Sequence, residues 1–404
     1  MNTAGLIGIS GFGNVHYHDL LREHEAGRMK YLAATVINQP EEPEKCAKLR
    51  DLGIEIFDDH RAMLQKYAGK LDLVCIPTGI ALHAPMAIDA MKAGANALIE
   101  KPAAATIQEV IAMQEAEKKY GKFTAVSFQS IYSAELLELK KQILKGVIGK
   151  ITRMVACGLE PRTFAYYTRN NWAGCLKGKR GEWILDSPYN NAVAHQLNMM
   201  TFLAGKTFEM PAAPVSALAE LYHANKIESA DTASIAIETR ENIPLYFYIS
   251  HAAESSLRTG FKIYGSAGTI DVTLETFTIE TTAGKKELPW QRDHINLRER
   301  IMEAVRARIA DPKAFYCSLE IARAHTLCVN GAHESSGGIA QINPGSIHET
   351  GEGKDLRIEV RGMDQAVKTA ADKMQMLSQV NQDLFQGSGR KVSLVDYRNF
   401  PAKK

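Results

Sequence analysis

Between Gly5 and about Thr124, short apolar runs alternate strictly with segments that suit helices. Continuous apolar runs are typical of strands buried in a parallel sheet, and each parallel strand needs a crossover, usually a helix, to reach the next. The alternation therefore predicts an α/β domain over residues 1–124, in which helices cover both faces of a doubly wound parallel sheet. The later strand-like runs are 31–37, 71–76, 97–99 and 123–128, and the helix-like segments are 43–52, 61–67, 84–93 and 106–119.

The turn after the first apolar run holds a nearly complete G-x-G-x-x-G pattern, GFGNV at residues 11–15, with His16 in place of the third glycine. It stands between a strand-like run and a helix-like segment, the context that a dinucleotide-binding Rossmann turn requires. Gly11 would allow the tight turn, and Gly13 would let backbone N–H groups approach a pyrophosphate at the helix N-terminus. His16 predicts a slightly splayed helix start or a side chain turned outward. The alternative is a structural turn without a ligand.

Composition narrows the classes of function. The 404 residues are enough for two domains, and the net charge of +2 without a basic run argues against a nucleic-acid surface. No apolar stretch is long enough to span a membrane. Six scattered cysteines without a C-x-x-C pair fit a reducing compartment and predict no metal site. Met1 leads directly into the first strand, which leaves no room for a signal peptide, so we expect a cytoplasmic protein.

After about residue 130 the chain becomes rich in strands, which predicts a second α/β domain over residues 125–404 with an open, largely antiparallel sheet. Gly265 and Gly268 predict a hairpin turn. The segment Pro344–Asp355 reads as an exposed loop, whose role as a lid, an oligomer contact or a solvated loop stays open, and 363–384 reads as a final helix. The predicted strand segments are 151–159, 215–223, 233–239, 244–250 and 259–272, and the helical segments are 134–145, 297–309 and 319–331.

Three motifs in this order resemble the Gfo/Idh/MocA family of NAD(P)-dependent oxidoreductases: the glycine turn, IEKP at 99–102, and WILD at 183–186 running on to HQLN at 195–198. The resemblance implies an N-terminal Rossmann domain, a C-terminal domain built on an open sheet, and a homodimer or homotetramer formed through that sheet's face. Pro77, Thr78 and His83 resemble the family's preceding strand and loop, although this loop is longer than usual.

Lys101 follows a strand-like run, and therefore stands at the carboxyl edge where open α/β sheets bind ligands. Similar enzymes use this lysine to hold the substrate hydroxyl, so the resemblance implies a catalytic role. The alternative is a solvated surface lysine.

The third motif departs from the family pattern D-x-x-x-H-x-x-D, and two registers compete. In one, Asp186 is the first carboxylate and Asn190 replaces the histidine. In the other, His195 is the histidine, with Asn191 and Asn198 in place of the carboxylates. We choose His195 as general base and Asn191 as its partner on one helical face, with Asp186 as a further candidate. A histidine packed at a domain interface is the alternative.

The stretch YYTRNNW at 166–172 is the most polar-aromatic in the chain. Sugars need many hydrogen-bonding groups and a flat ring for their C–H groups, and this stretch supplies both. An interface with a neighbouring subunit would have a similar composition. The predicted substrate-binding residues are Gln129, Arg162, Tyr167, Arg169, Asn170, Asn171 and Trp172.

Asn38 ends the second strand-like run, where an acidic residue would bind the ribose hydroxyls of NAD. Glu41 and Glu42 follow and no arginine is present for a 2′-phosphate, so we expect NAD without excluding NADP. The predicted cofactor-binding residues are Gly11, Phe12, Gly13, Asn14, Val15, Asn38, Pro77, Thr78, His83, Glu100 and Lys101.

Together these features predict an oxidoreductase that transfers a hydride between NAD(P) and a hydroxyl carbon of a sugar, glycoside or polyol. One alternative is an NAD-dependent glycosidase that acts through transient sugar oxidation. Another is a non-catalytic regulator that binds nucleotide or sugar.

Overall fold

The computed structural model describes residues 1–290 and 294–402, and the chain divides into two compact units. The first comprises Met1–Tyr132 with Asp293–Ala322, and the second comprises Ser133–Arg292 with Arg323–Lys404. The sequence-based boundary between residues 124 and 125 differs from this division. Helix α9 (His294–Ala310), far along the chain, packs on α1 and on the 3-10 turn Gln129–Tyr132, which brings both segments into the first unit.

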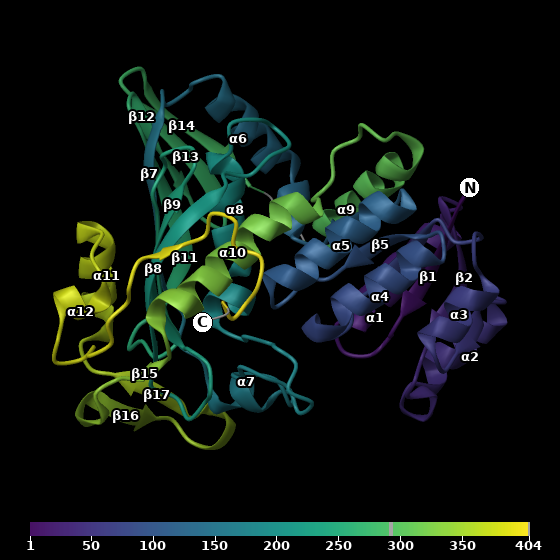
Figure 1. The fold of residues 1–404 in the computed structure, drawn as a ribbon, viewed down its shortest axis with the longest axis horizontal. Coiled ribbons are helices and arrows are strands. Elements are labelled where there is room, and N and C mark those ends of the chain that lie inside the picture. The colour runs from purple at the N-terminus through teal and green to yellow at the C-terminus, as the bar shows by residue number, and fades with distance from the viewer. Residues whose placement is uncertain (291–293, 403–404) are drawn as a thin grey trace. The chain divides into compact units, whose positions relative to one another are not determined.

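The first unit contains six parallel strands in the order β3-β2-β1-β4-β5-β6, which confirms the doubly wound sheet (Figure 1). Of these six strands, only β3, which has three half-buried residues, was not predicted from the sequence. The strands are β1 (Asn2–Ile7), β2 (Met29–Thr35), β3 (Glu55–Phe57), β4 (Leu73–Ile76), β5 (Asn96–Ile99) and β6 (Thr124–Val126). The helices besides α9 are α1 (Gly13–Glu25), α2 (Pro43–Asp51), α3 (His60–Lys66), α4 (Ile80–Lys92) and α5 (Ile107–Tyr120).

The second unit contains a mixed, mostly antiparallel sheet in the order β14-β13-β12-β11-β7-β10-β9-β8-β15, with β18 also paired to β8. The hairpin predicted at Gly265 and Gly268 joins β11 to β12. The strands are β7 (Ile151–Leu159), β8 (Pro214–His223), β9 (Thr232–Thr239), β10 (Leu245–Ser250), β11 (Leu257–Gly265), β12 (Gly268–Val272), β13 (Thr276–Thr281), β14 (Gly284–Pro289), β15 (Ala340–Gln341) and β18 (Val392–Ser393). The helices are α6 (Ala134–Leu144), α7 (Phe164–Thr168), α8 (Ala194–Ala204), α10 (Leu319–Ser336, from the end of the first unit), α11 (Met363–Lys373) and α12 (Leu377–Val380).

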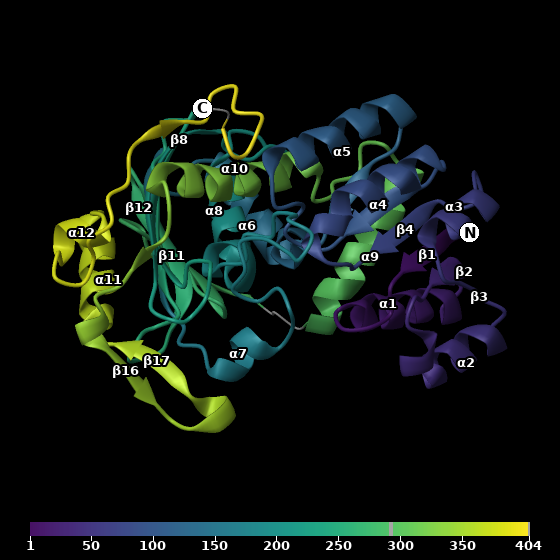
Figure 2. The same ribbon diagram turned by 60° about the horizontal axis from the view of Figure 1, so that its bottom comes forward.

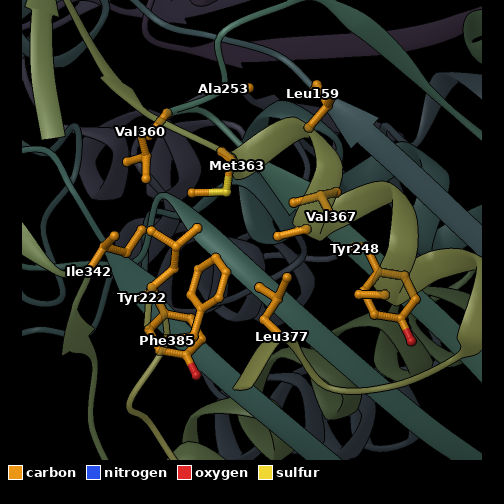
Figure 3. Close-up of a cluster of buried hydrophobic side chains, with 14 of the residues drawn as sticks. Leu159, Tyr222, Tyr248, Ala253, Ile342, Val360, Met363, Val367, Leu377 and Phe385 are labelled. Atoms are coloured by element: carbon orange, nitrogen blue, oxygen red, sulfur yellow. The ribbon is translucent and has the colours of Figure 1, made fainter. Parts of the chain in front are cut away.

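The predicted helix over 363–384 is two helices, because Met374 takes a left-handed conformation (φ +54°) that ends α11. Helix α11 lies on β7 and β10. Figure 3 shows Met363, Val367 and Leu377 facing Tyr222 and Tyr248 of the sheet in one buried cluster. The chain therefore covers part of its own sheet face with its C-terminal helices.

The expected loop Pro344–Asp355 is only partly a loop. Residues Ile347–Thr350 form β16, which pairs with β17 (Arg357–Val360) in a small antiparallel hairpin. In the loop that joins β16 to β17, the carbonyl of Leu356 accepts from the N–H of Phe164 in α7, 2.7 Å away, and Figure 2 shows the hairpin beside α7. Within the described residues, no helix combines the length and apolarity that crossing a membrane requires.

Candidate functional site

The glycine turn lies at the point where the strand order of the first sheet reverses. Strand β1 has β2 on one side and β4 on the other, and ligands of open α/β sheets bind outside the carboxyl ends of strands at such a point. Gly8 and Gly11 have φ angles of +91° and +56°, a conformation that favours glycine. A Cβ on Gly13 would lie 2.6 Å from the Gly8 carbonyl oxygen, so the backbone itself fills the space beside α1.

The start of α1 fits a dinucleotide phosphate. The helix has no side-chain cap at Phe12 and no acidic residue in its first turn, so its partial positive charge is not neutralised locally. Pro77 and Thr78, which follow β4, lie beside the turn: Pro77 Cγ is 3.6 Å from the Cβ position of Gly13. The Thr78 hydroxyl is buried without a hydrogen-bond partner in the described part of the chain. A ligand oxygen would satisfy it.

Asn38, where the family pattern has an acidic residue, is held at the end of β2. Its amide donates to the Ser10 hydroxyl and to the Glu41 carboxylate, both at 2.9 Å. Lys45 pairs with Glu42 at 2.8 Å, and this hydrogen bond, with that of Ser10, lowers the pKa of Glu42. The acidic groups beside Asn38 disfavour an added phosphate and are consistent with NAD.

His16 is completely buried, which overturns the outward orientation inferred from the sequence. Its Nε2 lies 2.7 Å from Glu100 Oε1, and Arg298 of α9 donates to the same oxygen at 3.0 Å and to Asp19 at 2.8 Å. Burial alone would raise the pKa of Glu100, but the His16 hydrogen bond and the Arg298 charge outweigh it and hold this pKa at about 2. Glu100 is therefore a buried, ionised carboxylate whose Oε1 is paired with His16 and Arg298.

The Glu100–Lys101 segment is tied to its surroundings through the backbone. The Lys101 N–H donates to Glu100 Oε2 at 3.2 Å. His83 is buried, with Nδ1 3.0 Å from the Pro102 carbonyl and Nε2 3.0 Å from the Thr78 carbonyl. Both ring nitrogens contact backbone carbonyls, so His83 links the loops after β4 and β5.

In the second unit, the polar-aromatic stretch gathers at the carboxyl ends of β7 and β10, which run parallel with Ser250 opposite Leu159. Helix α7 follows β7, and His251 follows β10 directly. The Tyr167 hydroxyl lies 3.4 Å from His251 Nδ1, and the rings of Tyr166 and His251 meet edge to face at 5.6 Å.

Arg169 occupies the aromatic surface expected for a sugar ring. Its guanidinium lies 3.8 Å from the Tyr166 ring centroid and 5.1 Å from that of Trp172. It also stands 4.0 Å from Asp186, while Arg162 pairs with Glu160 at 2.9 Å. The charges of this cluster are therefore balanced within it.

Asp186 is 5% exposed and serves as an anchor. It accepts from the Gly174 N–H at 2.7 Å and from the Asn191 amide at 2.8 Å, which fastens the 169–175 segment to Asn191. Asn191 lies in a π-helical turn, Pro188–Ala192, and partly exposed His195 lies in the first turn of α8. The two residues therefore do not share a continuous α-helical face, because Val193 (φ −121°) separates the two elements.

The remaining predicted substrate-binding residues have different environments. Asn170 Oδ1 accepts from the N–H groups of Trp172 and Ala173, so it stabilises its own turn, while Asn171 is exposed. Gln129 belongs to the first unit and the others to the second.

Sequence reasoning missed Gly8, Arg298 and His251. Gly8 is the residue directly after β1, and His251 stands directly after the predicted strand 244–250. The position directly after a predicted strand is the signal that points to His251. Arg298 had no such signal, because its partner Glu100 is 198 residues away. Among the described residues, no group of three or more His, Cys, Asp or Glu side chains is arranged to hold a metal.

Comparison with known proteins matches residues 3–128 to the Gfo/Idh/MocA model, described as an oxidoreductase family with an NAD-binding Rossmann fold. The chain is 31% identical over 96 residues to D-glucoside 3-dehydrogenase of Escherichia coli, which spans 24% of this chain and 27% of that protein. It is 24% identical over 206 residues to inositol 2-dehydrogenase/D-chiro-inositol 3-dehydrogenase of Halalkalibacterium halodurans, spanning 51% of this chain and 53% of that one. The matches thus span about a quarter to a half of these relatives.

The fold resembles that of levoglucosan dehydrogenase in complex with NADH and L-sorbose, with a TM-score of 0.69 over 83% of this chain and 96% of that one. The two sequences are 17% identical, so this likeness establishes the fold alone.

Proposed function

Residues 3–128 of this chain belong to the Gfo/Idh/MocA oxidoreductase family with its NAD-binding Rossmann fold, and from that premise we propose that the whole chain is an NAD-dependent dehydrogenase acting on a hydroxyl carbon of a sugar, glycoside or polyol. The observation that carries the proposal is the glycine turn at the reversal point of the first sheet, with an uncapped helix start and an unsatisfied Thr78 hydroxyl. Bound there, NAD would supply the hydride acceptor.

The substrate class is supported by the second unit. The hydroxyls of Tyr166 and Tyr167 and the indole N–H of Trp172 are groups that suit a polyhydroxylated ligand, and Arg169 covers one face of the Tyr166 ring. Arg162 and Arg169 have acidic partners, so the cluster has no excess charge that would require an anionic substrate. The names of the relatives, which act on glucosides and inositols, agree with a neutral sugar or polyol.

Each proposed role belongs to a named group. The turn at residues 11–15 holds the pyrophosphate, and Asn38 lies toward the ribose. The Lys101 ammonium holds the reacting oxygen, and the partly exposed His195 imidazole accepts the hydroxyl proton. Asp186 and Asn191 position the neighbouring segment through their hydrogen bond.

We further propose a cytoplasmic homodimer or homotetramer. Because α11 and α12 cover part of the sheet face, a second copy would bind beside them, over β11–β14, or at another surface.

The test is calorimetric titration of nucleotide-stripped protein with NAD and with NADP, followed by a screen of neutral sugars and polyols at the NADH absorbance. NAD binding and NADH production that His195→Ala and Lys101→Met abolish would support the dehydrogenase. Glycoside cleavage without NADH accumulation would indicate the glycosidase instead. Activity that survives both substitutions would overturn the assigned roles.

A further inference from the structure

His251 is fixed in place by its backbone at the carboxyl end of β10. Its N–H donates to the Asp231 carbonyl at 2.8 Å, and its own carbonyl accepts from the Arg162 N–H at 3.1 Å. The side chain is 1% exposed and has the partly buried side chain of Tyr167 against it. This ring therefore has little freedom to turn toward another partner.

The imidazole is neutral. Burial, reinforced by the positive charges of Arg162 and Arg169, lowers the pKa of His251 well below its ordinary value. A neutral imidazole carries one N–H and one lone pair, and the hydrogen bonds around the ring decide which nitrogen holds the proton.

Among the described residues, only one of the two ring nitrogens of His251 has a partner. Nδ1 lies 3.4 Å from the Tyr167 hydroxyl, whereas Nε2 is buried without a hydrogen-bond partner in the described part of the chain. A proton on Nε2 would leave a buried N–H donor unpaired, and orphaned N–H groups are rarer than under-used acceptors. A proton on Nδ1 can be donated to the Tyr167 oxygen.

In that arrangement the Tyr167 oxygen accepts from His251, and its hydrogen is free to point elsewhere. Burial and the charge of Asp231 raise the pKa of Tyr167 well above its ordinary value, so the group remains a phenol and a donor. Tyr167 stands in α7 beside Tyr166 and two residues before Arg169, in the stretch proposed to bind the substrate.

We propose that His251 is a positioning residue that sets the Tyr167 hydroxyl as a hydrogen-bond donor to an oxygen atom of an uncharged sugar or polyol. The inference rests on the proposed function, because it identifies Tyr167 as the group in the proposed site that donates a hydrogen bond to a substrate oxygen. His251 acts through Tyr167 and does not touch the substrate.

The kinetic test compares four variants with the full-length enzyme. Tyr167→Phe removes the donor and raises the sugar KM about tenfold with a smaller change in kcat. His251→Asn keeps an amide near the Nδ1 position and retains most of the affinity, whereas His251→Gln places its amide near Nε2 and loses as much as Tyr167→Phe. The double variant Tyr167→Phe/His251→Gln is no worse than Tyr167→Phe. Additive losses, or equal losses in the Asn and Gln variants, would overturn the pairing.

A second readout does not need activity. In an NMR spectrum of protein labelled with ¹⁵N-histidine, the signals of His251 are assigned as those, among the twelve histidines, that are missing in His251→Gln. We expect the Nδ1–H tautomer in the wild type and a change of tautomer or exchange in Tyr167→Phe, with NAD affinity unaltered. An Nε2–H tautomer in the wild type overturns the inference. The expected tautomer in a protein that oxidises no sugar would count against the proposed function alone.

Discussion

The imidazole of His16 lies 2.7 Å from the carboxylate of Glu100, and both side chains are buried in the first unit. His16 occupies the position where the dinucleotide-binding pattern has its third glycine, and Glu100 directly precedes Lys101. A side chain at a position usually left empty thus supports the segment at the end of β5 that carries the proposed catalytic lysine.

Replacing Arg298 by methionine should destabilise the first unit by about 3–5 kcal/mol, because the buried Glu100 carboxylate loses its guanidinium partner and Asp19 keeps only that of Arg22. Urea unfolding measures the loss. Arg298→Met/Glu100→Gln should recover part of it. Arg61→Ala is the matched control: the exposed Arg61 side chain pairs with Asp89 at 3.5 Å, and its loss should cost less than about 0.5 kcal/mol. Equal costs for Arg298→Met and the control would contradict the network's importance.

Gly13→Ala should weaken NAD binding at least about tenfold and lower the unfolding free energy by about 1–3 kcal/mol, because its Cβ would meet the Gly8 carbonyl oxygen at 2.6 Å. Gly79→Ala, near the same edge, is the control: its Cβ would have no heavy atom within 4 Å. Calorimetry and thermal unfolding report the two effects. Unchanged affinity in Gly13→Ala would mean that the phosphate lies elsewhere.

Lys140 should make stability depend on pH above neutrality. Its buried ammonium donates to the carbonyls of Phe202, Leu203 and Gly205 at the end of α8, and burial lowers its pKa to about 7. Between pH 7 and the ordinary lysine pKa, the unfolded state binds more protons than the native state, so the free energy of unfolding rises with pH.

From pH 7 to 9 the wild type should therefore gain about 2–3 kcal/mol relative to Lys140→Met. Urea titrations at several pH values give the difference. Parallel stability profiles for the two proteins would show that Lys140 does not titrate in this range.

The β16–β17 hairpin should govern sugar affinity, because the Leu356 carbonyl accepts from the first N–H of α7. Replacing residues 348–359 by a short Gly-Ser turn should raise the sugar KM roughly tenfold and leave NAD affinity unchanged, since a displaced positioning element costs this order of rate or affinity. Replacing the exposed 282–283 turn between β13 and β14 by the same Gly-Ser turn is the control. An unchanged sugar KM would show that the hairpin does not influence sugar binding.

The doubly wound first sheet, the glycine turn and the hairpin at Gly265 and Gly268 could all be predicted from the sequence. Each depends on neighbours close along the chain: apolar periodicity for the strands and backbone freedom for the glycines. The segments of the candidate site could also be predicted, since Lys101 lies two residues after β5 and the 166–172 stretch comes within the segment after β7.

The partners of the polar side chains in these segments emerge only in the folded protein. The sequence predicted catalytic or binding roles for Glu100, His83 and Asp186. In the structure the Glu100 carboxylate contacts His16, the His83 ring contacts two backbone carbonyls, and the Asp186 carboxylate accepts from Asn191. Hydrogen bonds of this kind join positions up to hundreds of residues apart, and a buried polar group takes whichever partner the fold brings near. The same reason explains why His251 and Arg298 emerged only with the structure.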